Sequence, residues 1–451
     1  MSPLDTVFKA YDIRGTVPEQ LDETVARAIG VAFARFTGAP RVLVARDMRP
    51  SGVALEAAVT AGLVEQGVDV VHLGLASTDL LYYSSGRFDA PGVMLTASHN
   101  PAQYNGIKCC LPGARPVGVD SGLLDVKRLA EQVLAGAGPA PAAQPGAQEH
   151  RDVLGDFADH VVSFVDVHAI GPLRVVADTA NGMGGLVVPA VFERLPRVEL
   201  EVMYGELDGT FPNHPADPIQ PANQRDLQAR VVAGGFDVGL AFDGDADRVF
   251  FVDESGRGLS GSTTTAILAS GVLAKHPGST ILHNLICSRA VPEVVRERGG
   301  VPVRTRVGHS FIKQVMAETG AAFGGEHSAH YYFRDNYRAD SGIIATMFLL
   351  EQLSQTGVPL SVMRKPFERY ASSGEINTEV DNPGAVIERV ADTFVQGEQD
   401  RLDGLTVDCG AWWFNLRPSN TEPLLRLNLE APTRDECDER VAQVLAVITA
   451  G

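Results

Sequence analysis

Residues 41–73 read RVLVARDMRPSGVALEAAVTAGLVEQGVDVVHL, and the fold class can be inferred from their pattern of apolar residues. Residues 41–46 form a short apolar run that predicts a buried strand, and residues 68–73 predict a second one. Between them, residues 53–66 carry apolar side chains at helical spacing. Because strands that alternate with helices form parallel sheets with crossover helices, we expect an α/β fold. Residues 92–96 (GVMLT) predict a third strand.

The alternation resumes after residues 135–148 (AGAGPAPAAQPGAQ), a run of small residues and prolines that predicts an exposed connector. The predicted strands of the next two rounds are 173–177, 236–242, 248–253, 279–286, 301–306 and 322–324. The last part of the chain has predicted strands at 375–380, 404–408, 411–416 and 424–430 and a helix at 435–449. We therefore expect three tandem mixed α/β domains and a smaller α+β C-terminal domain. Their predicted limits are 1–145, 150–254, 255–367 and 368–451.

The composition excludes several classes of protein. The net charge of −18 argues against a nucleic-acid partner, because phosphate backbones are bound by concentrated Lys and Arg. No apolar run approaches the roughly 20 residues of a membrane helix, and the first twelve residues lack a signal-peptide pattern. Five cysteines without a C-x-x-C pair indicate reduced thiols, so we expect a cytoplasmic protein with small-molecule partners. The sequence carries no signal for the oligomeric state.

A serine loop follows the predicted strand 92–96. It reads Thr96-Ala97-Ser98-His99-Asn100-Pro101. Open α/β sheets bind ligands at the carboxyl ends of their strands, where main-chain N–H groups favour anions. Ser98 is therefore a candidate nucleophile, and Lys108 could offset the charge of a phosphate. A serine in such a loop more often only stabilises the turn, so this motif alone does not establish a nucleophile.

The segment 243–248 (DGDADR) lies between two predicted strands. Three carboxylates at alternate positions repel one another unless a cation lies among them, and oxygen ligands suit Mg²⁺ or Ca²⁺. A solvated acidic turn is the alternative. An EF-hand is excluded, because its sixth position must be glycine and here it is Arg248. Few protein ligands leave room around a Mg²⁺ for water and one substrate or phosphoserine oxygen, which suits phosphoryl transfer.

Two further polar loops follow predicted strands. In residues 324–330 (GGEHSAH), Glu326 and Ser328 would face the same way in an extended loop and could hold adjacent sugar hydroxyls. His330 in this loop and His309 in the third domain are additional candidates. The loop 417–423 (RPSNTEP) combines a guanidinium, hydroxyls and an amide, which favours a phosphate site. The candidate phosphate ligands in it are Arg417, Ser419, Asn420 and Thr421.

In this order, the four loops make the chain resemble the α-D-phosphohexomutase family, from FKAYDIRG at residues 8–15 to Arg417 and beyond. The resemblance implies four domains around a central cleft, with a phosphorylated Ser98. It implies Mg²⁺ held by the phosphoserine and the three aspartates, Asp243, Asp245 and Asp247. The phosphate would move between C6 and C1 of a hexose through a hexose 1,6-bisphosphate. Alignment and charge stabilisation carry most of such a reaction, and Arg248 and Lys108 could supply the charge.

The resemblance also implies roles for other residues. Tyr11 and Arg14 would lie in the cleft, and Arg46, Asp47 and Arg49 would support the first domain. Either Lys108 or His99 would accept the proton near Ser98, and His309 and His330 would lie near the sugar.

Substrate choice is indicated by smaller details. Residues 325–330 (GEHSAH) and Thr96 are more similar to bifunctional phosphomannomutase/phosphoglucomutase enzymes than to phosphoglucosamine mutases. One departure is Ile286, where some bifunctional enzymes have a lysine; Arg289 is the candidate to compensate for it. Phosphoglucosamine mutase is the nearest alternative function. An aspartate-nucleophile phosphohydrolase using Asp243 and a silent sugar-phosphate sensor are the alternatives from other classes.

Overall fold

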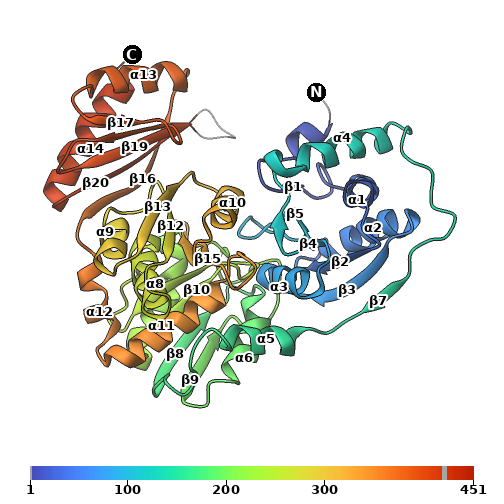
Figure 1. The fold of residues 1–451 in the computed structure, drawn as a ribbon, viewed down its shortest axis with the longest axis horizontal. Helices are drawn as coiled ribbons and strands as arrows, with labels where there is room; N and C mark the ends of the chain where they lie inside the picture. Colours follow the sequence, from blue (N-terminus) through green and yellow to red (C-terminus); the bar gives the residue numbers. More distant parts are fainter. Residues whose placement is uncertain (1–2, 419–423, 451) are drawn as a thin grey trace.

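The protein is described by a computed structural model that covers residues 3–418 and 424–450, without the side chains of Pro3 and His309. The described chain contains four sheets (Figure 1). Three are mixed sheets flanked by helices, and the fourth is antiparallel. The predicted fold class is therefore confirmed. The residue limits of the four domains stay a prediction.

The first sheet has the strand order β1-β5-β4-β2-β3-β7, with β6 paired to β5. Its strands are β1 (Ile13–Thr16), β2 (Arg41–Arg46), β3 (Asp69–Leu75), β4 (Gly92–Leu95), β5 (Tyr104–Leu111), β6 (Arg115–Pro116) and β7 (Gln148–His150). Its helices are α1 (Glu23–Thr37), α2 (Gly52–Glu65), α3 (Thr78–Phe88) and α4 (Leu123–Leu134). The parallel pairing of β2 with β3 and β4 confirms the arrangement predicted from residues 41–73.

The connector 135–148 is exposed over most of its length, as predicted. The sequence did not predict that the connector ends in a strand. Residues 148–150 form the edge strand β7, which lies beside β3. The extended backbone at that edge is paired rather than left open, although its composition carries no strand signal.

The second sheet has the order β11-β10-β8-β9. It contains β8 (Leu173–Asp178), β9 (Val198–Met203), β10 (Val238–Phe242), β11 (Val249–Asp253) and helices α5 (Leu154–Val162), α6 (Gly184–Phe192) and α7 (Arg225–Gly234). The pair β10–β11 is antiparallel, so the acidic segment 243–248 is the turn of a hairpin.

The third sheet has the order β13-β12-β14-β15. It contains β12 (Thr280–Asn284), β13 (Val301–Thr305), β14 (Phe323–Gly325) and β15 (Tyr331–Phe333). Its helices are α8 (Gly261–Lys275), α9 (Ala290–Glu297), α10 (His309–Thr319), α11 (Gly342–Thr356) and α12 (Leu360–Met363).

The fourth sheet has the order β16-β20-β19-β18-β17. It contains β16 (Ala371–Glu379), β17 (Glu398–Asp400), β18 (Leu405–Asp408), β19 (Trp413–Pro418), β20 (Leu424–Ala431) and helices α13 (Pro383–Thr393) and α14 (Arg434–Thr449). Helix α13 was not predicted, although Asn382 caps it and Pro383 occupies its first position.

The buried apolar residues show how these units are assembled. One large core joins the second and third sheets to the α3 face of the first sheet. The opposite face of the first sheet packs against α1, α2 and α4 in a core of its own. The fourth sheet also has a separate core and lies above the third in Figure 1. No helix among residues 3–418 and 424–450 is long and apolar enough to span a bilayer.

Candidate active site

The serine loop leaves the carboxyl end of β4 and is fastened from within. Ser98 has a positive φ of 50°, a conformation that is costly for a residue other than glycine. The fully buried guanidinium of Arg49 holds the loop by its main chain. It donates to four carbonyl oxygens, those of Ser98 (2.9 Å), Asn100 (2.6 Å), Pro101 (2.8 Å) and Tyr104 (2.9 Å). Asp47 pairs with the same guanidinium at 3.2 Å, which fits the supporting role implied for both residues.

The hydroxyl of Ser98 points at the second sheet. Its Oγ donates a hydrogen bond of 2.8 Å to Oδ2 of Asp243, which lies in the acidic turn. Nη2 of Arg248 lies 3.4 Å from the same Oγ, and Nδ1 of His99 lies 3.3 Å from it. The serine oxygen therefore lies between a carboxylate, a guanidinium and an imidazole, where a phosphate would meet at least one fixed positive charge.

The three aspartates of the acidic turn converge at this point. Asp243, Asp245 and Asp247 are almost completely buried, and one ligand oxygen from each lies within 4.8 Å of the others. Lys108 from β5 donates to Oδ2 of Asp245 at 2.7 Å and to Oδ2 of Asp247 at 2.9 Å. Asp243 is paired instead with Arg248 at 2.9 Å.

The acidic turn fits a divalent cation. Oδ1 of Asp245 and Oδ1 of Asp247 are buried, yet neither accepts a hydrogen bond from any described residue. Unsatisfied buried carboxylate oxygens are costly unless a cation binds them. Burial raises the pKa of Asp243, whereas Lys108 outweighs burial and holds the pKa of Asp245 well below its usual range. Two buried oxygens that accept no hydrogen bond, on two carboxylates of one acidic cluster, are what a hard cation requires.

Neither predicted proton acceptor is free in this arrangement. Although burial opposes the charge of Lys108, Asp245 and Asp247 raise the pKa of this lysine well above its usual range. Nη2 of Arg248 lies 2.6 Å from Nδ1 of His99 and donates to it. Burial, together with the charge of Arg248, also keeps the pKa of His99 well below its usual range. The sequence offered these two residues as alternatives, and the geometry leaves Oδ2 of Asp243 as the oxygen that accepts from Ser98.

Two residues of the N-terminal segment frame the site. Arg14 contacts the side chains of Asp12 and Asn100, so its guanidinium lies beside the serine loop. The hydroxyl of Tyr11 donates to the carbonyl of Val307 at 3.2 Å. It lies so close to Gly308 that a Cβ on that glycine would come within 2.4 Å of it. Tyr11 thus joins the first sheet's domain to the loop after β13.

The loop after β14 is a tight turn, which corrects the expectation of an extended loop. The N–H of Glu326 donates to the carbonyl of His330, and the N–H of Ala329 donates back to the carbonyl of Glu326, both at 3.0 Å. Glu326 is buried and accepts from Tyr332 at 2.7 Å. Oγ of Ser328 lies 3.0 Å from Nδ1 of His330. Because the chain reverses here, the side chain of His330 links Glu326 to Ser328. The two residues are not brought together by the alternation of side chains along an extended loop.

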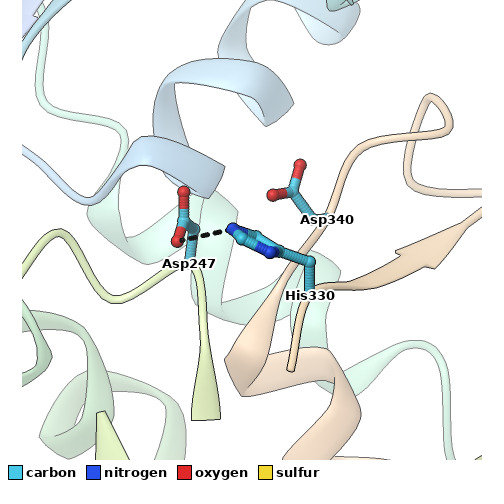
Figure 2. Close-up of side chains that lie close together, drawn as sticks. All are labelled: Asp247, His330 and Asp340. Atoms are coloured by element: carbon cyan, nitrogen blue, oxygen red, sulfur yellow. Dashed lines mark ion pairs between the residues drawn. The ribbon is translucent and has the colours of Figure 1, made fainter. Parts of the chain in front are cut away.

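His330 links this turn to the aspartates. Its Nε2 lies 3.8 Å from Oδ1 of Asp247, and Figure 2 shows the ring directed at that carboxylate. Asp340 also approaches, and one ligand atom from each of Asp247, His330 and Asp340 lies within 4.8 Å of the others. Asp340 itself forms a buried ion pair of 2.7 Å with Lys313 of α10. The serine loop, the acidic turn and the loop after β14 therefore form one connected polar cluster.

Other predicted residues lie outside this cluster or outside the described residues. Arg417 is at the end of β19 and pairs with Glu375 at 2.9 Å within the fourth sheet. Ser419, Asn420 and Thr421 fall in the undescribed segment 419–423. His309 is the first residue of α10, and its side chain is not described. Arg289 pairs with Asp408 at 2.6 Å. That Arg289 compensates for Ile286 stays a prediction.

Ile286 itself lines a cavity of about 470 Å³ between the third and fourth sheets. Ser262, Ser288 and His327 also line it.

Sequence reasoning missed Thr78 and Asn100 as part of the site. Thr78, the first residue of α3, donates its hydroxyl to Oδ2 of Asp245 at 2.6 Å. Its position could have been inferred, because Ser77-Thr78-Asp79 follows β3 in the way that the serine loop follows β4. Asn100 was quoted within the serine motif without a role, and here it receives Arg14.

All four parts of the chain match one family. Residues 5–123, 155–256 and 260–370 match the phosphoglucomutase/phosphomannomutase α/β/α domains I, II and III, and residues 375–447 match the C-terminal domain of the same family. The phosphohexose mutases of Xanthomonas campestris pv. campestris (strain ATCC 33913) are 41% identical over 429 residues, covering 94% of each chain. The phosphomannomutase of Salmonella montevideo is 39% identical over 437 residues, covering 94% of this chain and 95% of the relative.

A solved structure gives the same result for the fold. The phosphoglucomutase/phosphomannomutase family protein from Burkholderia thailandensis is 31% identical and superposes with a TM-score of 0.90. The match covers 100% of this chain and 99% of that one. Sequence and fold thus agree over the whole length.

Proposed function

Because this chain belongs to the phosphoglucomutase/phosphomannomutase family, we propose that it is a phosphohexose mutase that moves phosphate between C6 and C1 of a hexose through Ser98. The observation that carries the proposal is the position of Oγ of Ser98, 2.8 Å from Asp243 and 3.4 Å from Nη2 of Arg248. A buried hydroxyl beside a fixed guanidinium is suited to carrying a phosphate and passing it on.

The proposed cycle has two transfers that balance. In the first, a hydroxyl of the sugar phosphate attacks phosphorus and the P–O bond of phosphoserine 98 breaks; the proton of that hydroxyl ends on the departing Oγ of Ser98, which leaves a hexose 1,6-bisphosphate and a free serine. In the second, Oγ of Ser98 attacks the phosphate at the other carbon, the P–O bond to the sugar breaks, and the serine proton ends on the departing sugar oxygen. Arg248 stabilises the charge that spreads over the phosphoryl oxygens, and Arg49 keeps the serine loop fixed.

We assign the cation to Asp243, Asp245 and Asp247, together with an oxygen of phosphoserine 98. The buried Oδ1 atoms of Asp245 and Asp247, which accept no hydrogen bond from any described residue, support this assignment. When bound, Mg²⁺ would neutralise the charge of the transferring phosphoryl group. Lys108 balances the charge of two of these aspartates. A hexose 1,6-bisphosphate is expected to act as activator and intermediate.

The sugar is assigned to the turn after β14 and to the fourth domain. Glu326, Ser328 and His330 lie next to the acidic turn and are the proposed sugar ligands, with Tyr11 and His309 nearby. Arg417 with Ser419, Asn420 and Thr421 would bind the phosphate that is not being transferred. The name of the Salmonella montevideo relative favours mannose phosphate, and the name of the matching family favours mannose and glucose phosphates. The five free cysteines support our expectation that the enzyme works in the cytoplasm.

The decisive experiment combines mass spectrometry with kinetics. The protein is incubated with glucose 1,6-bisphosphate and Mg²⁺ and digested, and the peptide that contains Ser98 is weighed. We expect it to gain one phosphate, and we expect Ser98→Ala to gain none and to lose turnover. Peptide that stays unmodified under every condition would overturn the proposal. Ser98→Ala protein that still released inorganic phosphate would favour the aspartate-dependent phosphatase instead.

A comparison of substrates refines the proposal. The kcat/KM values for mannose 1-phosphate, glucose 1-phosphate and glucosamine 1-phosphate are measured side by side with Mg²⁺. We expect mannose or glucose 1-phosphate to exceed glucosamine 1-phosphate. The reverse order would indicate that the chain is a phosphoglucosamine mutase and would leave the role of Ser98 intact.

A further inference from the structure

Thr78 lies at the contact between the first domain and the acidic turn. It is the first residue of α3 and is fully buried. Its hydroxyl donates to Oδ2 of Asp245 at 2.6 Å, and its main-chain N–H donates to the carbonyl oxygen of the same aspartate at 3.1 Å. One residue of the first domain thus holds both the main chain and the side chain of Asp245, which belongs to the second sheet.

The two oxygens of Asp245 have different surroundings. Oδ2 accepts from Thr78 and also from Nζ of Lys108 at 2.7 Å. Oδ1 is buried and has no hydrogen-bond donor within the described part of the chain. A carboxylate that is held by two donors on one oxygen cannot rotate freely, so its other oxygen is also held in one position. One ligand oxygen of Asp245 lies within 4.8 Å of one from Asp243 and one from Asp247.

Thr78 is itself held rigidly. Ser77 caps the N-terminus of α3 by accepting the N–H of Leu80. Oδ2 of Asp79 accepts from Oγ of Ser341 at 2.6 Å, and Ser341 caps α11 of the third domain. The first turn of α3 is therefore fixed between two other domains, so the position of its threonine is set by their packing rather than by a flexible loop.

We infer that Thr78 is a positioning residue that orients Asp245 for the divalent cation. This inference rests on the proposed function, because it presupposes that the acidic turn binds a cation. Loss of an outer hydrogen bond to a metal ligand typically weakens metal binding 10–100-fold. We expect a loss of about that size when the hydroxyl of Thr78 is removed, with Asp245 still in place.

The test uses Mn²⁺ as the probe for the Mg²⁺ site. Titrations followed by electron paramagnetic resonance give the Mn²⁺ affinity of the wild type, Thr78→Val and Thr78→Ser. Valine keeps the shape of threonine without the hydroxyl, and serine keeps the hydroxyl. We expect valine to weaken Mn²⁺ binding about 10–100-fold and serine to retain wild-type affinity within about threefold. The Mg²⁺ concentration for half-maximal activity should rise with valine, while kcat at saturating Mg²⁺ changes less.

Thr346→Val is the matched control. Thr346 is a fully buried threonine of α11, and its hydroxyl donates to the carbonyl of Gly342 at 3.0 Å, within its own helix. We expect this variant to bind Mn²⁺ as the wild type does. Thr78→Ala, which removes the hydroxyl without placing a methyl group beside the carboxylate, replaces Thr78→Val if circular dichroism shows that the valine variant is unfolded.

The outcomes separate this inference from the proposal on which it rests. Equal Mn²⁺ affinity of the wild type and the folded Thr78 variant overturns the positioning role and leaves the proposed mutase untouched. An equal loss with serine and with valine also overturns it, because the hydroxyl would then be irrelevant. A wild-type protein that binds no Mn²⁺ overturns both the cation assignment and this inference.

Discussion

Ser98 and Asp243 lie 145 positions apart in the sequence, yet the serine hydroxyl donates to the aspartate at 2.8 Å. The contact joins the end of β4 in the first sheet to the hairpin between β10 and β11 in the second. Each loop follows the carboxyl end of a strand, and packing of the two sheets through one core brings these ends together. The chemistry of the site therefore depends on domain packing as much as on either loop.

Gly244 makes this approach possible. A Cβ at this position would come within 2.4 Å of the carbonyl oxygen of Ser98, which is a main-chain atom that cannot turn away. We expect Gly244→Ala to displace the serine loop from Asp243 and to lower kcat about 100-fold, because small misplacements of reacting groups have effects of that size. The control is Gly155→Ala in α5, where the nearest atom outside the helix backbone that an added Cβ would meet is Nη2 of Arg194 at 3.9 Å; this variant should keep wild-type kcat. Wild-type turnover of Gly244→Ala would contradict the dependence on this approach.

Arg49 should be essential for the order of the serine loop. Its guanidinium is completely buried and donates to four carbonyl oxygens of residues 98–104 as well as to Asp47. Arg49→Met removes a donor from each of those oxygens and leaves the buried carboxylate of Asp47 without its counter-charge, which costs about 3–5 kcal/mol. We expect faster hydrogen exchange of the main-chain amides in residues 97–104 and a lower melting temperature.

The carboxylate accounts for part of that cost. We expect the double variant Arg49→Met/Asp47→Asn to recover some of the lost melting temperature, because it no longer buries an unpaired charge. Arg128→Met, at an exposed ion pair with Asp125, should leave exchange in residues 97–104 unchanged. Unaltered exchange in Arg49→Met would show that the loop is held by other contacts.

The sequence was informative wherever a feature is local. The strand–helix–strand pattern of residues 41–73 and the two strands on either side of residues 243–248 follow from short-range spacing, and both were found. The antiparallel pairing of those two strands was not predicted. Partners that depend on packing could not be found in this way. Asn382 and Pro383 signalled a helix that was overlooked. The place of Thr78 after β3 indicates a loop at the binding edge of the sheet, but its pairing with Asp245 depends on how the two domains pack. The turn at Glu326 also depends on contacts with Tyr332 and His330, which alternation alone does not reveal.

Asp79 should make stability depend on pH. Burial raises the pKa of Asp79 to about 7, although Ser341 and Ser77 donate hydrogen bonds to it, and the charges of Asp247 and Asp340 raise it further. The folded protein then binds this proton more tightly than the unfolded chain does. The resulting stability is fully present below about pH 4 and is lost as the pH rises through about 7, by at most about 4 kcal/mol.

Asp79→Asn tests this dependence. The amide keeps the size of the side chain without the charge, so we expect the variant to lose less melting temperature than the wild type between pH 5 and pH 8. It should be the more stable of the two at pH 8. The control is Asp125→Asn, at an exposed carboxylate of α4, whose curve should follow that of the wild type. Parallel curves for Asp79→Asn and the wild type would contradict the raised pKa.

Lys108 should oppose cation binding by its charge, in contrast to Thr78, although both donate to Oδ2 of Asp245. Lys108→Gln removes a positive charge that lies within 2.9 Å of two buried carboxylates. Without a cation, those carboxylates lose the positive charge that balances them, so we expect the melting temperature to fall. With Mn²⁺ or Mg²⁺ present, the stronger negative field should tighten binding at least about threefold and raise the melting temperature more than in the wild type.

Lys127→Gln, which removes a lysine paired with Asp5 at the surface, should show the wild-type response to the cation. A cation-induced rise in Lys108→Gln no larger than in the wild type would contradict this account. Weaker binding in Thr78→Val together with tighter binding in Lys108→Gln would separate the orientation of Asp245 from the charge around it.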